Sequence, residues 1–338
     1  MGSIWSQTCS IGRRPPLRGH LKTQAAVVGA GMAGVLTAYA LQQAGLSVVV
    51  LEADRIAGGQ TQNTTAKITS QHGLIYSRLI QSFGEETARR YAKANQDAVR
   101  AYQDLIDVQG ISCDWEERCA YLYGPDVTVL QEEAEAARRL GLPASFTREV
   151  SIPIPHDGAV CFEGQAQFHP LKFLKVLADQ LTIYEQSRVL TAEGDLLTTE
   201  LGSVQAEHIV FACHFPFVNF PGMYFARMHQ ERSYVLALQG APPVDGMFLG
   251  EWDGTPSLSA PMGNCSCWAA EAIAPARTPR GAGMTCSGGR PGSGSPRARR
   301  PPTGLPRTAC RLTMCPISAP TPPAIPAGMW PLGSRSGA

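Results

Sequence analysis

The sequence predicts an α/β protein that ends in a disordered C-terminal tail. A glycine-rich turn joins a short apolar run to a helix pattern early in the chain, and strand and helix patterns alternate after it. The composition then changes abruptly near residue 257. With 338 residues, the chain is long enough for about two domains.

The overall composition excludes several classes of protein. The chain is 44% hydrophobic and 17% charged, with a formal net charge of +1. These averages exclude a wholly disordered chain and give no reason to expect nucleic acid as a partner. The 10 cysteines show no spacing typical of zinc, Rieske or disulfide sites. We therefore expect reduced thiols, no metal and a cytoplasmic location.

The N-terminal region raises the question of membrane targeting. Residues 1–22 are expected to form an N-terminal extension, because they lack the apolar core of a signal peptide. Residues 23–51 carry no charge, and such a stretch is long enough to cross a bilayer. The glycine spacing and the polar pair Gln42-Gln43 favour a buried strand, a helix and a second strand instead. We therefore expect no membrane span.

The strongest pattern is a strand–helix–strand unit of about thirty residues. Residues 24–28 are predicted to form a buried strand, residues 32–44 a helix ended by Gly45, and residues 47–51 a second strand. The run Gly29-Ala30-Gly31-Met32-Ala33-Gly34 joins the first strand to the helix.

This glycine spacing is typical of a dinucleotide-binding turn. Gly29 permits the tight turn, Gly31 lets the backbone approach a pyrophosphate, and Gly34 lets the helix pack closely on the strand. The helix N-terminus adds partial positive charge. Glu52, at the end of the second strand, is placed to accept hydrogen bonds from ribose hydroxyls and would repel a 2′-phosphate. A glycine-rich turn without a ligand is the alternative.

A polar loop follows the second strand. Residues 55–61 and 63–67 combine adjacent glycines with small hydroxyl side chains and end at Lys67. Such residues can wrap a pyrophosphate and lead the chain toward a ring system. An ordinary polar loop is the alternative.

Further patterns predict a mixture of helices and strands. Ser82 and Glu85 form a capping box for a helix that runs to about residue 108. Asp126 is placed to cap a helix that ends before Gly141, and Pro170 suits the first turn of a helix over 171–181. Strands are predicted over 120–123, 187–191, 208–213 and 233–238.

Four segments resemble the FAD-dependent oxidoreductases of the D-amino-acid oxidase and glycine oxidase superfamily, namely residues 23–52, 58–72, 167–173 and 209–214. The chain is most similar to a bacterial branch that often carries a Rieske domain after the flavoprotein, although no Rieske ligand pattern occurs here. The resemblance extends from about residue 3 to residue 253.

The resemblance implies a Rossmann-like FAD-binding domain with a second, mixed α+β substrate domain, both within residues 23–256. The FAD-binding parts would be about 23–80 and 150–215, and the substrate domain would use the segments between and after them. The domain organisation is therefore an extension (1–22), an oxidoreductase region and a tail (257–338).

The resemblance also implies where FAD binds. Glu52 would hold the adenosine ribose, and residues 58–67 would lie near the pyrophosphate and flavin. The backbone of Val189 would meet adenine, and Ala212 would lie beside the cofactor. The cofactor-binding residues so predicted are Gly29, Ala30, Gly31, Met32, Ala33, Gly34, Glu52, Ala53, Gly59, Thr61, Thr65, Lys67, Val189 and Ala212.

The same resemblance implies an enzyme that oxidises a small amine or amino acid by hydride transfer to flavin, with an electron acceptor that the sequence leaves open. Candidate substrate-side residues are His72, His214, Arg232 and Tyr234. An arginine can clamp a carboxylate with two hydrogen bonds, although Arg232 could equally be a solvated surface residue. Either histidine could equally be structural.

Two rival functions need to be distinguished from this one. The chain could be a non-catalytic nucleotide-binding remnant with a disordered basic tail. An NAD-dependent dehydrogenase is disfavoured, because no second nucleotide motif is visible.

Residues 257–338 differ in composition from the rest of the chain. They hold 14 Pro, 11 Gly and 9 Arg, but one acid (Glu271) and no Val, Phe or Tyr. This composition is typical of disordered, low-complexity sequence.

We expect this tail to be translated out of frame. In a frame offset by two bases, some dipeptides force one residue: Asn264-Cys265 and Cys267-Trp268 give Leu, Trp268-Ala269 gives Gly, Met329-Trp330 gives Val, and Trp330-Pro331 gives Ala. Permitted codons elsewhere allow strings similar to the family's C-terminal strand, glycine-rich turn and flavin-covering segment. Because that segment would be missing, we expect FAD to bind weakly or not at all, which would leave the chain inactive as written.

Overall fold

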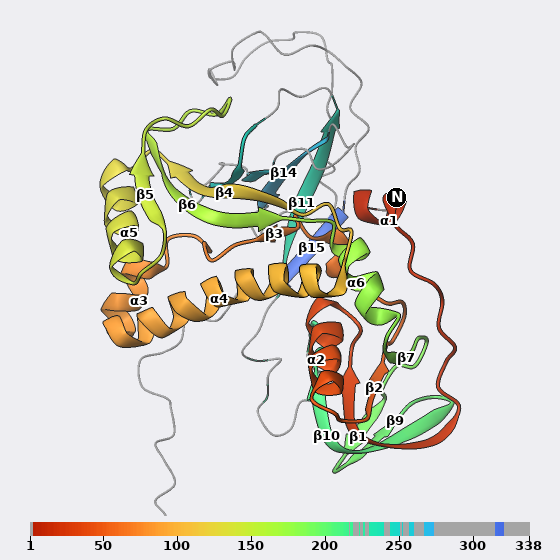
Figure 1. Cartoon of the computed structure of the whole chain (residues 1–338). Coiled ribbons are helices and arrows are strands. Elements are labelled where there is room, and N and C mark those ends of the chain that lie inside the picture. The colour runs from red at the N-terminus through yellow and green to blue at the C-terminus, as the bar shows by residue number, and fades with distance from the viewer. Residues whose placement is uncertain are drawn as a thin grey trace, which may run out of the picture. The chain divides into compact units, whose positions relative to one another are not determined.

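The computed structural model describes residues 3–215 continuously and short segments beyond them. These segments are 217–218, 223, 226, 230–239, 244–250, 252, 257–259, 267–273 and 315–320. For 230–239, 267–273 and 315–320 the description covers the backbone alone. The chain divides into two compact units, and Figure 1 labels most of their helices and strands. Unit 1 combines residues 1–9, 63–173 and 233–316, and unit 2 combines residues 10–62, 174–232 and 317–338.

Unit 2 is built on a six-stranded sheet. Strand β1 (Gly19–Val28) pairs in parallel with β2 (Val48–Leu51) on one side and with β10 (Gly202–Phe211) on the other. The full order is β7-β2-β1-β10-β9-β8, with β7 at Thr182–Tyr184, β8 at Thr191–Glu193 and β9 at Leu196–Thr198. Residues 25–28 of β1 are buried, as expected for a central parallel strand.

The uncharged stretch 23–51 forms the predicted strand, helix and strand. Helix α2 (Met32–Gln43) lies between β1 and β2, and β1 begins five residues earlier than the pattern predicts. None of the helices among the described residues combines the length and apolar character that a bilayer crossing needs.

The strand predicted over 187–191 is wrong. The backbone N–H of Ser187 donates to Glu52 O, whereas the N–H of Leu190 donates to Thr198 O, at 2.8 Å each. Because Ser187 and Leu190 bond to different segments, residues 187–190 form no continuous ladder, and only Thr191 belongs to a strand, β8.

The second sheet has nine strands, most of them in unit 1. Its order is β15-β11-β14-β13-β12-β4-β6-β3, with β5 paired to β6. The strands are β3 (Lys67–Ile68), β4 (Glu116–Gly124), β5 (Ala144–Thr147), β6 (Gly158–Gln167), β11 (Gln230–Gln239), β12 (Met247–Gly250), β13 (Ser257–Ser259), β14 (Cys267–Ile273) and β15 (Cys315–Pro320).

Three helices cover one face of β4 and β6 in unit 1. They are α3 (Tyr76–Phe83), α4 (Glu85–Gln109) and α5 (Val127–Arg139), and Figure 1 shows them beside these strands. Tyr76, Ala92 and Leu130 pack in one apolar core with Leu122 of β4 and Phe162 of β6. The opposite face carries a smaller cluster around Tyr123 and Phe248.

The helix ends show where local signals succeed and fail. The predicted capping box is wrong, because Ser82 lies inside α3 and α4 begins after Gly84, whose φ is +79°. Asp126 does cap α5, since its carboxylate accepts from the N–H groups of Thr128 and Val129 at 3.1 Å each. Helix α6 (Pro170–Ala178) begins at Pro170 as expected but ends before the predicted residue 181.

Three strands lie inside the predicted disordered tail. Strand β13 pairs with β12 and β14, and β14 pairs with β11. Strand β15 contains two prolines and ends the sheet, which is where proline is tolerated in a strand. Strand pairing uses backbone groups alone, so an unusual composition does not prevent it. The rest of 257–338 lies outside the described residues.

The short helix α1 (Ile4–Thr8) joins a hydrogen-bonded chain at His169 in unit 1. The backbone N–H of Lys172 donates to His169 Nδ1 at 3.3 Å, so the ring proton resides on Nε2. His169 Nε2 donates to Thr8 Oγ1 at 2.9 Å, and Thr8 Oγ1 donates to Ile4 O at 2.8 Å. Burial, and then the neighbouring Lys172 ammonium, lower the pKa of His169.

The stability of the protein is therefore expected to fall as the pH drops. The unfolded chain binds a proton at His169 near the ordinary pKa of about 6.5, whereas the folded chain resists it, so acidification favours unfolding. Urea midpoints between about pH 8 and about pH 5 measure this dependence. We expect a weaker pH dependence in His169→Gln than in the parent. His72→Gln, which alters an exposed histidine, should keep the parent dependence; equal slopes in all three proteins would contradict the assignment.

Candidate cofactor site

The glycine-rich turn opens onto a cavity of about 840 Å³ in unit 2. The cavity lies where β1, β2 and β10 end, since Val28, Leu51 and Ala212 line it. Ligands of open α/β sheets bind beyond the carboxyl ends of the strands. Predicted residues that line the cavity are Gly29, Gly31, Met32, Ala33, Glu52, Ala53, Gly59, Thr61, Val189, Ala212 and His214.

Each glycine of the turn is required, or tolerated, for a different steric reason. Gly29 has a φ of +106°, and a Cβ there would lie 2.9 Å from Ala212 O. A Cβ on Gly34 would meet Gly29 O far inside the 3.0 Å that real Cβ atoms keep. A Cβ on Gly31 would meet nothing closer than Thr61 Oγ1 at 3.4 Å. Gly29 and Gly34 therefore serve packing, whereas Gly31 leaves the cavity open beside the helix.

The first turn of α2 offers positive potential to the cavity. Its N-cap residue, Gly31, has no side chain that could cap the helix, and the first turn holds no acidic residue. Thr61 Oγ1 accepts from the backbone N–H of Met32 at 2.9 Å. A helix N-terminus of this kind, with a hydroxyl beside it, suits the diphosphate of a dinucleotide.

Glu52 lies at the edge of the cavity and is fixed by the backbone. One carboxylate oxygen accepts from the N–H of Ala30 at 2.7 Å and the other from the N–H of Asp54 at 2.9 Å. Each oxygen retains a further lone pair for a hydroxyl. The residues present thus fit a dinucleotide, because the cradle, the helix end and the acceptor for a ribose lie around one cavity.

Sequence patterns did not reveal the buried acid that supports this site. Glu185 is 1% exposed, and its carboxylate accepts from Arg55 Nη1 at 2.5 Å, Ile56 N at 2.8 Å and Arg14 N at 2.9 Å. Arg55 also donates to Ile11 O at 2.9 Å and lines the cavity. Glu185 follows a three-residue strand, which gives no recognisable motif.

Other residues line the cavity without having been predicted. Leu190 and Phe217 are exposed apolar side chains, and Phe217 meets the ring of Phe211 edge-on at 5.7 Å between centroids. Burial raises the pKa of the Cys213 thiol, which also lines the cavity. Arg188 adds a cationic side chain to the lining.

Several predicted residues lie elsewhere. Ala30 and Gly34 are buried beneath the turn. Thr65 and Lys67 belong to unit 1, where Lys67 Nζ donates to Phe248 O at 3.0 Å. Residues 63–80 and 150–173 of the predicted FAD-binding parts also belong to unit 1.

The substrate-side candidates belong to both units. His214 lines the cavity of unit 2. His72 lies in unit 1, where its Nε2 is 3.2 Å from Asn95 Oδ1. Arg232 and Tyr234 lie on β11, of which the backbone alone is described.

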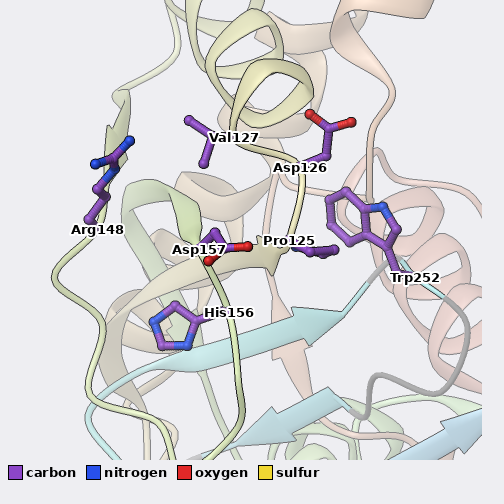
Figure 2. A pocket seen from close by; sticks show the side chains of 7 residues that line it. All are labelled: Pro125, Asp126, Val127, Arg148, His156, Asp157 and Trp252. Carbon is purple, nitrogen blue, oxygen red and sulfur yellow. The ribbon is translucent and has the colours of Figure 1, made fainter.

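Unit 1 has a separate, open hollow of about 700 Å³, shown in Figure 2. Figure 2 shows Arg148 across the hollow from Asp126 and Trp252. Asp126 caps α5, and His156 Nδ1 donates to Ile154 O at 2.8 Å. The Trp252 ring occupies the space that a side chain at Gly124 would need. Because Asp126, His156 and Trp252 have structural roles, we assign no site to this hollow.

Comparison with known proteins agrees with the geometry in unit 2. The family model DAO, described as FAD dependent oxidoreductase, matches residues 24–259. A Bacillus subtilis (strain 168) protein named "Putative Rieske 2Fe-2S iron-sulfur protein YhfW" is 35% identical over 262 residues, which cover 73% of this chain and 51% of that protein. Gamma-glutamylputrescine oxidoreductase of Escherichia coli (strain K12) is 26% identical over 202 residues, covering 55% of this chain and 47% of that protein. The chain thus spans about half the length of the curated relatives it matches.

A solved structure shares the fold. Glycine oxidase from Geobacillus kaustophilus superposes with a TM-score of 0.56 at 16% identity, covering 77% of this chain and 75% of that one. This likeness supports the predicted α/β fold class.

Proposed function

Because the chain belongs to the DAO family of FAD dependent oxidoreductases, we propose that it oxidises a small amine or amino acid with FAD held in unit 2. The observation that carries the proposal is the glycine turn, which joins the N-terminus of α2 and the Glu52 carboxylate around one cavity. The names of two similar proteins, gamma-glutamylputrescine oxidoreductase and glycine oxidase, support an amine or amino acid as substrate.

The described residues of unit 2 bind and orient the cofactor. FAD, when bound, supplies the ring that accepts a hydride from the substrate carbon. The N–H groups of the first turn of α2 beyond Met32, together with the Thr61 hydroxyl that bonds to Met32 N, would face the diphosphate, and Glu52 would accept from the ribose. The Val189 backbone would meet adenine. Ala212 lines the cavity with a small side chain, and its carbonyl lies close to Gly29.

We propose the substrate contacts from the residues that the sequence singles out. His214 lines the cavity, which supports a place near bound ligand. Arg232 is proposed to clamp a substrate carboxylate through two parallel hydrogen bonds, with Tyr234 on the same strand. His72 bonds to Asn95, and this bond favours a structural role for His72 over contact with substrate.

We also propose that the residues after about 257 are read out of frame and that this weakens FAD binding. The composition changes at this point, and the family match ends at residue 259. In the family, by resemblance, the missing segment supplies a core strand and backbone contacts to the flavin. Without it, a sheet edge and apolar surface lose their cover, and aggregation becomes easier. A nucleotide-binding remnant without catalysis is the rival function.

Expression of two versions of the chain tests both proposals. One is the 338-residue chain, and the other follows the offset frame from codon 257 onward. We expect stoichiometric FAD, bleached by an amine or amino acid without oxygen, in the frame-restored protein and little FAD in the other. Equal stoichiometric FAD in both would contradict the frame proposal. A frame-restored protein that stays colourless with added FAD would contradict the proposed function.

A further inference from the structure

The loop that lines one side of the cavity has little regular structure of its own. This pocket loop, residues 55–64, contains one 3-10 turn at Thr61–Asn63 and contributes six residues to the cavity lining. Inside the loop, Gly58 N donates to Arg55 O at 2.9 Å and Gln62 N donates to Ala57 O at 3.1 Å, whereas Ala57 N donates to Ala30 O, outside the loop, at 2.9 Å. Ala57 has a φ of +58°, which is disfavoured for a residue with a Cβ. Contacts from outside the loop therefore add to its internal bonds in fixing its shape.

One such contact lies at the C-terminal end of the pocket loop, within unit 1. Trp5 Nε1 donates to Thr64 O at 2.8 Å. The Trp5 ring meets the His169 ring edge-on, with 5.0 Å between centroids. Ser3 Oγ accepts from Ser6 N at 3.2 Å at the start of α1, and Thr8 bonds to His169 at its end. The indole is thus held by both ends of its helix.

A second set of contacts lies at the N-terminal end of the pocket loop, within unit 2. Ile11 O accepts from Arg55 Nη2 at 2.9 Å. Arg14 N donates to the same Glu185 carboxylate that accepts from Ile56 N. Leu17 N donates to Ser187 Oγ at 2.8 Å, two residues before Val189 of the cavity lining.

From these contacts we infer that residues 3–17, which we call the N-terminal strap, position the pocket loop for FAD. The strap anchors the loop at both ends, through Thr64 at one and through Arg55 and Glu185 at the other. Anchoring both ends of an irregular loop removes conformations that would otherwise be lost on binding. Trp5 is therefore a positioning residue that acts through the pocket loop, and this role rests on the proposed FAD site.

The sharpest test removes the indole N–H of Trp5 and keeps an aromatic ring at the position. Trp5→Phe keeps the ring beside His169 but loses the indole N–H that bonds to Thr64 O. Trp115→Phe is the matched control, because Trp115 Nε1 is buried without a hydrogen-bond partner in the part of the chain that the structure describes. Both variants are made in the frame-restored chain. Hydrogen exchange of residues 57–66 is measured without FAD, and the FAD dissociation rate is measured separately.

The expected result is faster amide exchange across residues 57–66 and faster FAD dissociation in Trp5→Phe, each by roughly fivefold, as for the loss of one hydrogen bond. Trp115→Phe should match the parent in both measurements. Unchanged exchange of the pocket loop in Trp5→Phe would overturn the inference, as would unchanged FAD dissociation. If exchange rises in Trp5→Phe but the parent binds no FAD, the proposed function fails while the anchoring of the loop stands.

Discussion

Alanine at position 34 is expected to destroy the packing of α2 against β1. The added Cβ would collide with the backbone carbonyl of Gly29, which cannot move without displacing the turn. Overpacking typically costs about 1–3 kcal/mol, and a clash with backbone belongs at the upper end, so Gly34→Ala should unfold at a much lower urea concentration than the parent. FAD affinity should fall with it, since the displaced turn forms the cavity wall.

Gly12→Ala is the control for this effect. Gly12 also belongs to unit 2, but a Cβ there would meet nothing within 4 Å. Its unfolding midpoint should stay close to that of the parent. An unshifted midpoint in Gly34→Ala would show that the close approach of helix and strand is not what the glycine provides.

The substitution Glu185→Gln is expected to cause the second large loss of stability. The substitution keeps the size of the side chain but places an NH₂ group where the carboxylate accepts from Arg14, Arg55 and Ile56. At least one buried donor then loses its acceptor, and the buried charge pair with Arg55 is broken. We expect a loss of roughly 2–4 kcal/mol in the free energy of unfolding, reduced from the usual range because Arg55 is partly exposed.

The exposed ion pair between Arg14 and Asp179 serves as the control for the buried carboxylate of Glu185. Arg14 Nη2 lies 2.5 Å from Asp179 Oδ1, and the Asp179 side chain is 48% exposed. Asp179→Asn should cost under about 1 kcal/mol, as exposed pairs do. Chemical denaturation of both variants measures the difference. Equal small losses would mean that Glu185 does not hold the pocket loop.

Sequence patterns predicted the parts of the fold that depend on local chemistry. The strand–helix–strand unit around Gly29 and the Asp126 cap follow from spacing and side-chain type alone, and the structure contains both. The capping box at Ser82 failed, because Gly84 separates two helices where the pattern predicts one. The strand over 187–191 failed because its backbone bonds go to two different segments.

The supporting contacts of the site could not be predicted, because they join residues far apart in the chain. Glu185 meets Arg14 across 171 positions, and Trp5 meets Thr64 across 59. Glu133 likewise accepts from the N–H groups of Ile75, Tyr76 and Ser77, in a buried place that its polar type does not suggest. Such contacts leave no periodicity and no motif in the sequence.

The position of β1 in its sheet determines how long one of its edges stays unpaired during synthesis on the ribosome. Its partner β2 follows it closely, but its other partner, β10, begins about 150 residues after β2 ends. At about 5–20 residues per second, translation leaves that edge of β1 unpaired for roughly 8–30 s. The nascent polypeptide must be shielded during this interval, so its yield should depend on the chaperones of the expression host.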